Sequence, residues 1–373
     1  MSDSNLKPLF DLTPTEEQTL MRDTVRKFVQ NELKAKVRAA DEAAEPPAGF
    51  YEKVQELGFN MVAIPESMGG FGAARSPVGN VLIAEDLANG DLSLALGAMS
   101  ALSFVNTVID QGSEAQQQTY LPAFAEETFR PAGLALMEPG LRANPAQPKT
   151  RAVRDGNDYV LRGEKTMVPL GCSAEHLIVS ATVESEGVCA FILNRGTAGV
   201  SAEREKYMGL RPLELAHLKL ENVRVPAAQK LGEGEKTFDV QRVLSLSRIG
   251  LSALAVGTCN AALEYVKDYC NERVAFGEPI TNRQSVAFMI ANMAIELDGL
   301  RLMTYRAASR AEQGLPFERE AYLAKLQATD YGMQIGTDGV QLLGGHGFIR
   351  DHMVELYYRN LRALGVLEGA LCV

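Results

Sequence analysis

The chain has 373 residues, of which 46% are hydrophobic and 23% charged, and its formal net charge is −10. This composition is typical of a globular protein long enough for two or three structural units. The negative charge argues against nucleic acid and anionic membrane surfaces as partners, because both reward clustered Lys and Arg. The five cysteines form no CxxC pair, which disfavours a disulfide framework or a zinc site. Without an apolar run of about 18 residues, we expect a cytoplasmic protein with no membrane span.

The first part of the chain shows a helical period. The sequence Thr13-Pro14-Thr15-Glu16 predicts a capping box at Thr13, with Pro14 at the first helical position. Apolar residues then recur on one face from 21 to 33, and a second helix is predicted to run toward residue 57. Further helical patterns continue to about residue 126. We expect an N-terminal α-helical domain over residues 1–130.

From about residue 131 the pattern indicates strands. Segments 151–153 and 159–161 flank Asp155-Gly156, which is a hairpin signal. Three further short segments, 176–183, 188–193 and 218–225, are rich in apolar and β-branched residues. We expect a middle β domain over residues 131–232.

Long helical patterns return after Gly232. They cover residues 237–272, 284–313 and 318–343 and contain few helix-breaking residues. Helices of this length suit a bundle. We therefore expect a C-terminal helical domain over residues 233–373, and an α+β fold that is mostly α.

Three pieces of the last hundred residues carry a resemblance to a known family. They are Arg273-Val274-Ala275-Phe276-Gly277 with Gln284, Gln341-Leu342-Leu343-Gly344-Gly345-His346-Gly347-Phe348, and Glu368-Gly369. An Arg can pair with pyrophosphate, a glycine-rich turn lets backbone N–H groups approach phosphate or a flavin, and a carboxylate can act as a base. Together they resemble the flavin-binding and catalytic-base region of the acyl-CoA dehydrogenases.

The resemblance extends over nearly the whole chain and implies a fold and a cofactor. The implied fold has an N-terminal helical domain, a middle β-barrel-like domain and a C-terminal four-helix bundle. The implied cofactor is FAD, held partly across a subunit boundary, so that a homotetramer or a dimer is expected. The FAD-binding residues that it implies in this chain are Arg273, Phe276, Gln284, Gln341, Gly344 and Gly345.

The resemblance also implies a reaction, the α,β-dehydrogenation of an acyl thioester in fatty acid metabolism. A carboxylate removes the α proton while flavin N5 takes the β hydride. Glu368 lies nine residues past Arg359, the offset of the family's catalytic Glu, and Arg248 matches a substrate-binding Arg. Some relatives place the base immediately before that Arg, where this chain has Ser247. The expected electron acceptor is an electron-transfer flavoprotein.

The sequence departs from the family pattern around the flavin ring. Met137 replaces a Thr, and Met167 and Val168 lie in a segment that has lost a Trp and a hydroxyl. Ala143 replaces a Ser near a substrate phosphate. Met137, Met167 and Val168 are thus expected beside the ring, and Ala143, with Arg248, at the substrate.

Two classes of function are compatible with these residues. The first is a working FAD-dependent oxidoreductase acting on a coenzyme A or carrier-bound thioester. The second is a non-catalytic scaffold that binds an acyl thioester or a partner protein. Retention of Glu368 favours the enzyme.

Overall fold

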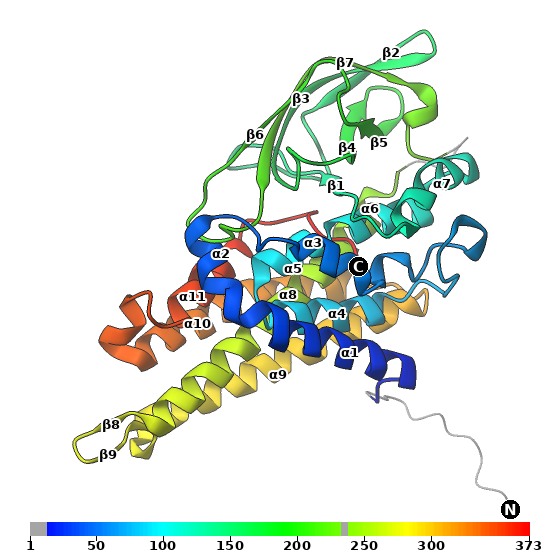
Figure 1. Ribbon diagram of the computed structural model, residues 1–373. Coiled ribbons are helices and arrows are strands. Elements are labelled where there is room, and N and C mark those ends of the chain that lie inside the picture. The colour runs from blue at the N-terminus through cyan, green and yellow to red at the C-terminus, as the bar shows by residue number, and fades with distance from the viewer. Residues whose placement is uncertain (1–12, 233–237) are drawn as a thin grey trace, which may run out of the picture.

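The computed structural model describes residues 13–232 and 238–373, so that the predicted helix start at 237 and boundary at 233 lie outside the described residues. Helices come first, a sheet follows, and helices return (Figure 1). The sheet lies to one side of the helices, next to α6 and α7. The expected α+β, mostly α fold is confirmed.

The N-terminal part is helical, as predicted. Its α-helices are α1 (Glu16–Phe28), α2 (Val37–Ala43), α3 (Phe50–Glu56), α4 (Pro77–Ala88), α5 (Leu92–Ala98), α6 (Ser100–Gln111) and α7 (Glu114–Tyr120). The predicted capping box was placed two residues too early. Thr15, rather than Thr13, caps α1, because its hydroxyl accepts from Gln18 N and the Gln18 side chain accepts from Thr15 N. The two possible capping boxes, TPTE at residues 13–16 and TEEQ at residues 15–18, overlap in the sequence, and the structure uses the second.

The middle part is a seven-stranded sheet. Its strands are β1 (Ala132–Ala135), β2 (Arg151–Asp155), β3 (Asp158–Pro169), β4 (His176–Val183), β5 (Gly187–Asn194), β6 (Val200–Arg204) and β7 (Leu215–Pro226). The order is β1-β4-β2-β3-β7-β6, with β5 paired to β4. The predicted β2–β3 hairpin is confirmed, and Gly156 supplies its positive φ of 64°. Side chains of these strands form a second hydrophobic cluster, which is separate from the helical core.

The C-terminal part contains four helices. They are α8 (Val240–Glu272), α9 (Gln284–Glu312), α10 (Glu318–Leu343) and α11 (Val354–Ala363), and a hairpin of β8 (Val274–Ala275) and β9 (Glu278–Pro279) joins α8 to α9. The three long helices match the predicted stretches within the described residues. Helix α8 crosses α4 at Gly257, where an added Cβ would lie 2.1 Å from Glu85 O. Only glycine permits this close crossing.

Helix α8 is also the one unbroken helix among the described residues that is long and apolar enough to cross a membrane. Within its most apolar window, however, 78% of the residues are buried inside the structure. That burial is typical of the central helix of a packed core.

Candidate active site around Glu368

Glu368 lies on the segment that follows α11. Leu367 before it is fully buried, and Gly369 after it has a φ of 65°. A Cβ at Gly369 would lie 2.9 Å from Leu136 Cδ1. Both the positive φ and this close approach therefore require glycine at position 369. The Glu368 side chain remains 28% exposed. The local fold thus buries the backbone around Glu368 and leaves its carboxylate accessible.

Two cations from different helices face the Glu368 carboxylate. Arg248 Nε, from α8, lies 3.3 and 3.4 Å from its two oxygens, and Lys325 Nζ, from α10, lies 3.9 Å from one of them. The guanidinium of Arg248 lies over the ring of Tyr322, 5.5 Å from its centroid. Lys325 also donates to Leu364 O at 2.7 Å. Burial lowers the pKa of Lys325, because desolvation disfavours its charged form.

The structure brings Met137 directly to Glu368. The Glu368 N–H donates to Met137 Sδ at 3.1 Å. Met137 O in turn accepts from Thr166 N, next to Met167 and Val168 at the end of β3. Of the three residues expected beside the flavin ring, Met137 therefore contacts the expected base, and Met167 and Val168 follow the residue that pairs with Met137.

Met167 occupies a strained backbone position, with a φ of 54°. Its N–H donates to Glu205 Oε2 at 2.9 Å, and the neighbouring Thr166 hydroxyl donates to the same carboxylate. Met167 also lines a cavity of about 180 Å³ together with Leu210 and Val366. Since these backbone and hydroxyl donors are already engaged, Met137 and Met167 offer apolar side chains rather than free hydrogen-bond donors.

A buried ion pair supports this edge from behind. Lys165 Nζ lies 2.9 Å from Glu138 Oε1 and 3.2 Å from Ser180 Oγ, and the lysine is fully buried. Desolvation lowers the pKa of Lys165 to about 8. Glu138 also accepts from the backbone N–H groups of Lys149 and Thr150. The pair thus joins the segment of Met137 to that of Met167.

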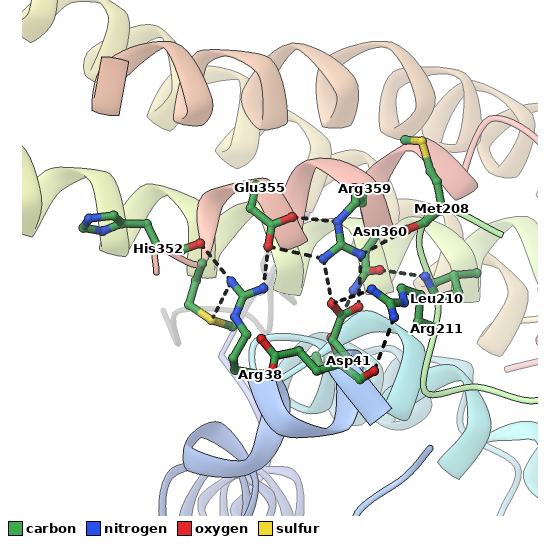
Figure 2. A network of polar contacts seen from close by, with 12 residues as sticks. Arg38, Asp41, Met208, Leu210, Arg211, His352, Glu355, Arg359 and Asn360 are labelled. Atoms are coloured by element: carbon green, nitrogen blue, oxygen red, sulfur yellow. Dashed lines mark hydrogen bonds and ion pairs between the residues drawn. The ribbon is translucent and has the colours of Figure 1, made fainter. Parts of the chain in front are cut away.

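A network around Arg359 holds α11 in place (Figure 2). Its guanidinium donates to both oxygens of the buried Asp41, at 3.0 and 2.8 Å, and to Met208 O at 3.0 Å. The neighbouring Asn360 accepts from Leu210 N and donates to Asp91 at 3.0 Å. Burial raises the pKa of Asp91. Helix α11 is therefore fixed to α2, to the loop before β7 and to the start of α5.

The remaining FAD-binding residues expected from the sequence lie elsewhere. Arg273 and Phe276 are on or beside the β8–β9 hairpin, at the end of the α8–α9 pair far from the sheet (Figure 1). Phe276 is 95% exposed. The other residues of this set, Gln284, Gln341, Gly344 and Gly345, are also exposed. One chain therefore does not bring this set together with Glu368.

Ala143 lies in an exposed turn, where its N–H donates to Gly140 O at 3.2 Å. The contacts of this turn do not include Glu368 or Arg248 within the described ranges. The expected pairing of Ala143 with Arg248 at one substrate thus stays a prediction.

Lys325 was missed by sequence reasoning, although a signal for it exists. It lies on the face of α10 formed by the buried Ala321, Ala324 and Ala328. Burying a lysine among alanines costs free energy unless its ammonium group has a partner. A lysine at this helical spacing is therefore a candidate site residue.

Comparison with known proteins identifies the family. The acyl-CoA dehydrogenase N-terminal, middle and C-terminal domains match residues 15–128, 133–223 and 238–371. The chain therefore belongs to the acyl-CoA dehydrogenase family. It is similar to an acyl-CoA dehydrogenase of Bacillus subtilis, with 31% identity over 95% of each chain.

Solved structures show the same fold. Butyryl-CoA dehydrogenase from Megasphaera elsdenii has a TM-score of 0.88 and 29% identity, covering 96% of this chain and 95% of its own. A glutaryl-CoA dehydrogenase from Mycobacterium smegmatis in complex with FADH2 has a TM-score of 0.85 and 26% identity, covering 95% and 91%.

Proposed function

We propose that this protein catalyses the FAD-dependent α,β-dehydrogenation of an acyl thioester. The observation that carries the proposal is the placement of Glu368, whose backbone N–H contacts Met137 Sδ and whose accessible carboxylate faces Arg248. A positioned carboxylate beside an apolar ring site is what removal of an α proton requires. Membership of the family supplies the cofactor, FAD.

In this reaction Glu368 takes the proton from the carbon next to the thioester carbonyl. The bound cofactor, FAD, would supply the two-electron acceptor for the β hydride, so that loss of the α proton and the β hydride would leave a carbon–carbon double bond. Arg248 and Lys325 face the carboxylate and hold it toward the reacting carbon by charge. Met137 and Met167 present an apolar wall, which excludes water from the proton transfer.

Two sets of residues would hold the cofactor. Met137, Met167 and Val168 would contact the flavin ring beside Glu368. The exposed set, Arg273, Phe276 and Gln284 at the hairpin and the start of α9 and Gln341, Gly344 and Gly345 at the end of α10, would come from a second copy of the chain. The distance of the hairpin from the sheet in Figure 1 supports this division, and with it a homodimer or homotetramer.

Substrate and partners follow from the same site. Arg248 and Ala143 would contact an acyl thioester, carried by coenzyme A or by a carrier protein. An electron-transfer flavoprotein would reoxidise the flavin, in fatty acid metabolism in the cytoplasm.

Glu368→Gln tests the proposal. The amide keeps the size of the side chain but accepts no α proton, so flavin bleaching by acyl-CoA should fall at least roughly 10³-fold while flavin content stays unchanged. Stopped-flow absorbance under anaerobic conditions measures both. If the variant bleaches as fast as the parent, Glu368 is not the base.

A non-catalytic scaffold is the second candidate. The donors of Thr166 and Met167 are engaged by Glu205, and this leaves fewer polar contacts for a flavin ring. The absorbance spectrum of the purified protein separates the two functions. A flavin spectrum that bleaches with substrate supports the enzyme, and a colourless protein that stays colourless with excess FAD supports the scaffold.

A further inference from the structure

The segment directly after Glu368 is buried inside the molecule. Residues 370–373 are at most 3% exposed, in contrast to the accessible Glu368 carboxylate. Figure 1 shows this red end of the chain running from α11 toward α6. The next space inward from Glu368, between α6 and α8, is therefore filled by the chain itself.

Side chains of the flanking elements satisfy the backbone of this segment. The N–H of Leu371 donates to Ser247 Oγ at 3.3 Å, and that of Cys372 donates to Ser103 Oγ at 2.9 Å. Asn106 Nδ2 donates to Cys372 O at 3.0 Å. Buried backbone groups are costly without partners, so these matched donors and acceptors hold the segment in one position.

A fourth contact holds the far end of the segment. Arg75 donates to Val373 O at 2.8 Å while it pairs with Asp110 of α6 at 3.0 Å. The segment is thus fixed between α6 and α8 by polar contacts along its length, from Leu371 to Val373.

The apolar side chains of the segment fit closely against α8. A Cβ added to Gly250 would lie 2.8 Å from Val373 Cγ1 and 2.9 Å from Leu371 Cγ. Glycine at this point of α8 therefore makes room for the segment. The wall that receives it combines this glycine with Ser103, Asn106 and Ser247, a lining that suits a peptide backbone better than an alkyl chain.

We propose that residues 370–373 form a fixed floor of the acyl site and restrict this protein to thioesters of short acyl groups. This inference rests on the proposed function, because it takes Glu368 as the residue that meets the α carbon. A short acyl group ends before Leu371. The further methylenes of a longer acyl group meet the side chains of Leu371 and Val373, which occupy the space that those methylenes need.

Binding of the unsaturated products tests the floor without requiring turnover. We expect the purified holoprotein to bind trans-2-butenoyl-CoA at least about tenfold more tightly than trans-2-octenoyl-CoA in isothermal titration calorimetry. The double variant Leu371→Ala/Val373→Ala opens the floor and should reduce or reverse this ratio. A matched control, Leu177→Ala/Val183→Ala in the sheet, removes similar buried volume far from Glu368 and should keep the parent ratio.

The outcomes separate the floor from the proposed function. A floor variant that gains no affinity for the octenoyl thioester relative to the butenoyl thioester overturns the inference. Failure of butyryl-CoA to bleach the flavin of the parent overturns the proposed function instead, and the binding ratio still tests the floor.

Alkylation of Cys372 provides a second measurement that needs no variant. The thiol is 1% exposed, and a fixed floor should keep it protected from iodoacetamide with and without trans-2-octenoyl-CoA, as read by peptide mass spectrometry. If trans-2-octenoyl-CoA makes Cys372 reactive, residues 370–373 move when a long thioester binds, and the inference of a fixed floor is wrong.

Discussion

Met137 contacts both parts of the proposed reaction centre. Its sulfur accepts from the Glu368 N–H, and its carbonyl accepts from the N–H next to Met167. A thioether is a weak acceptor and donates no hydrogen bond. The side chain therefore supports the position of the base but gives no directed stabilisation to a reduced flavin.

Met137→Thr should raise the flavin reduction potential and speed bleaching by substrate, because a hydroxyl donor would stabilise the negative charge that develops on reduction. A gain of about tenfold in bleaching rate would correspond to one such hydrogen bond. Met137→Val is the matched control, since it has the shape of Thr without the hydroxyl. Equal potentials in the Thr and Val variants would show that the hydroxyl contributes nothing.

Lys165 gives a pH-dependent prediction. Burial lowers its folded-state pKa to about 8, below its value in the unfolded chain. Between the folded-state and the unfolded-state pKa of Lys165, the unfolded chain binds more protons than the folded chain. The free energy of unfolding should therefore increase with pH in this range. Lys165→Met should abolish this rise and, at pH 7, lower stability by about 3 kcal/mol because Glu138 loses its partner.

Urea denaturation from pH 7 to 10 measures the effect of Lys165. Lys219→Met, at an exposed position of β7, is the control and should follow the parent profile. A Lys165→Met profile parallel to that of the parent would contradict the assignment.

At the scale of elements, α11 depends on a buried carboxylate from the N-terminal region. Asp41→Asn should destabilise the protein by about 3–5 kcal/mol, because it leaves Arg359 without its bidentate partner. Bleaching should also slow, since α11 leads directly to Glu368. Glu32→Gln, which breaks exposed ion pairs with Lys36 and Lys53, should change the stability little. Similar losses in both variants would refute the structural role of Asp41.

The sequence predicted the long helices and most strands because their periods are regular and their ends carry caps and breakers. Strands β1 and β6 were missed for opposite reasons. β1 (AGLA) is buried throughout and has low strand propensity, while β6 is mostly exposed and shows no alternation. Tertiary pairing with β4 and β7 makes them strands.

Glu368, Arg248 and Met137 were predicted one by one from the family pattern, and the structure brings them together. The contacts that position them were not predictable in the same way. Asp41 and Arg359 are 318 residues apart, and their pairing depends on three-dimensional packing that no local pattern encodes. The burial of Leu371 between α6 and α8 is of the same kind.

At the scale of the whole molecule, the exposed hairpin connects cofactor binding with assembly. Arg273→Ala should lower bound flavin and weaken the oligomer together, because one charged contact would join the pyrophosphate to a second copy. Flavin absorbance per chain and sedimentation velocity measure the two effects. Arg151→Ala, an exposed arginine of β2, is the control. Unchanged flavin content in the Arg273 variant would remove this residue from the cofactor site.

The network around Arg359 also sets an order of events during synthesis. Asp41 and Met208, the partners of Arg359, leave the ribosome well before α11 does, and so does Asp91, the partner of the neighbouring Asn360. These polar partners of α11 are therefore made in the first two thirds of the chain, whereas α10, against which α11 packs, and Glu368 are made later. A nascent chain accordingly carries no assembled proton acceptor until α11 has docked.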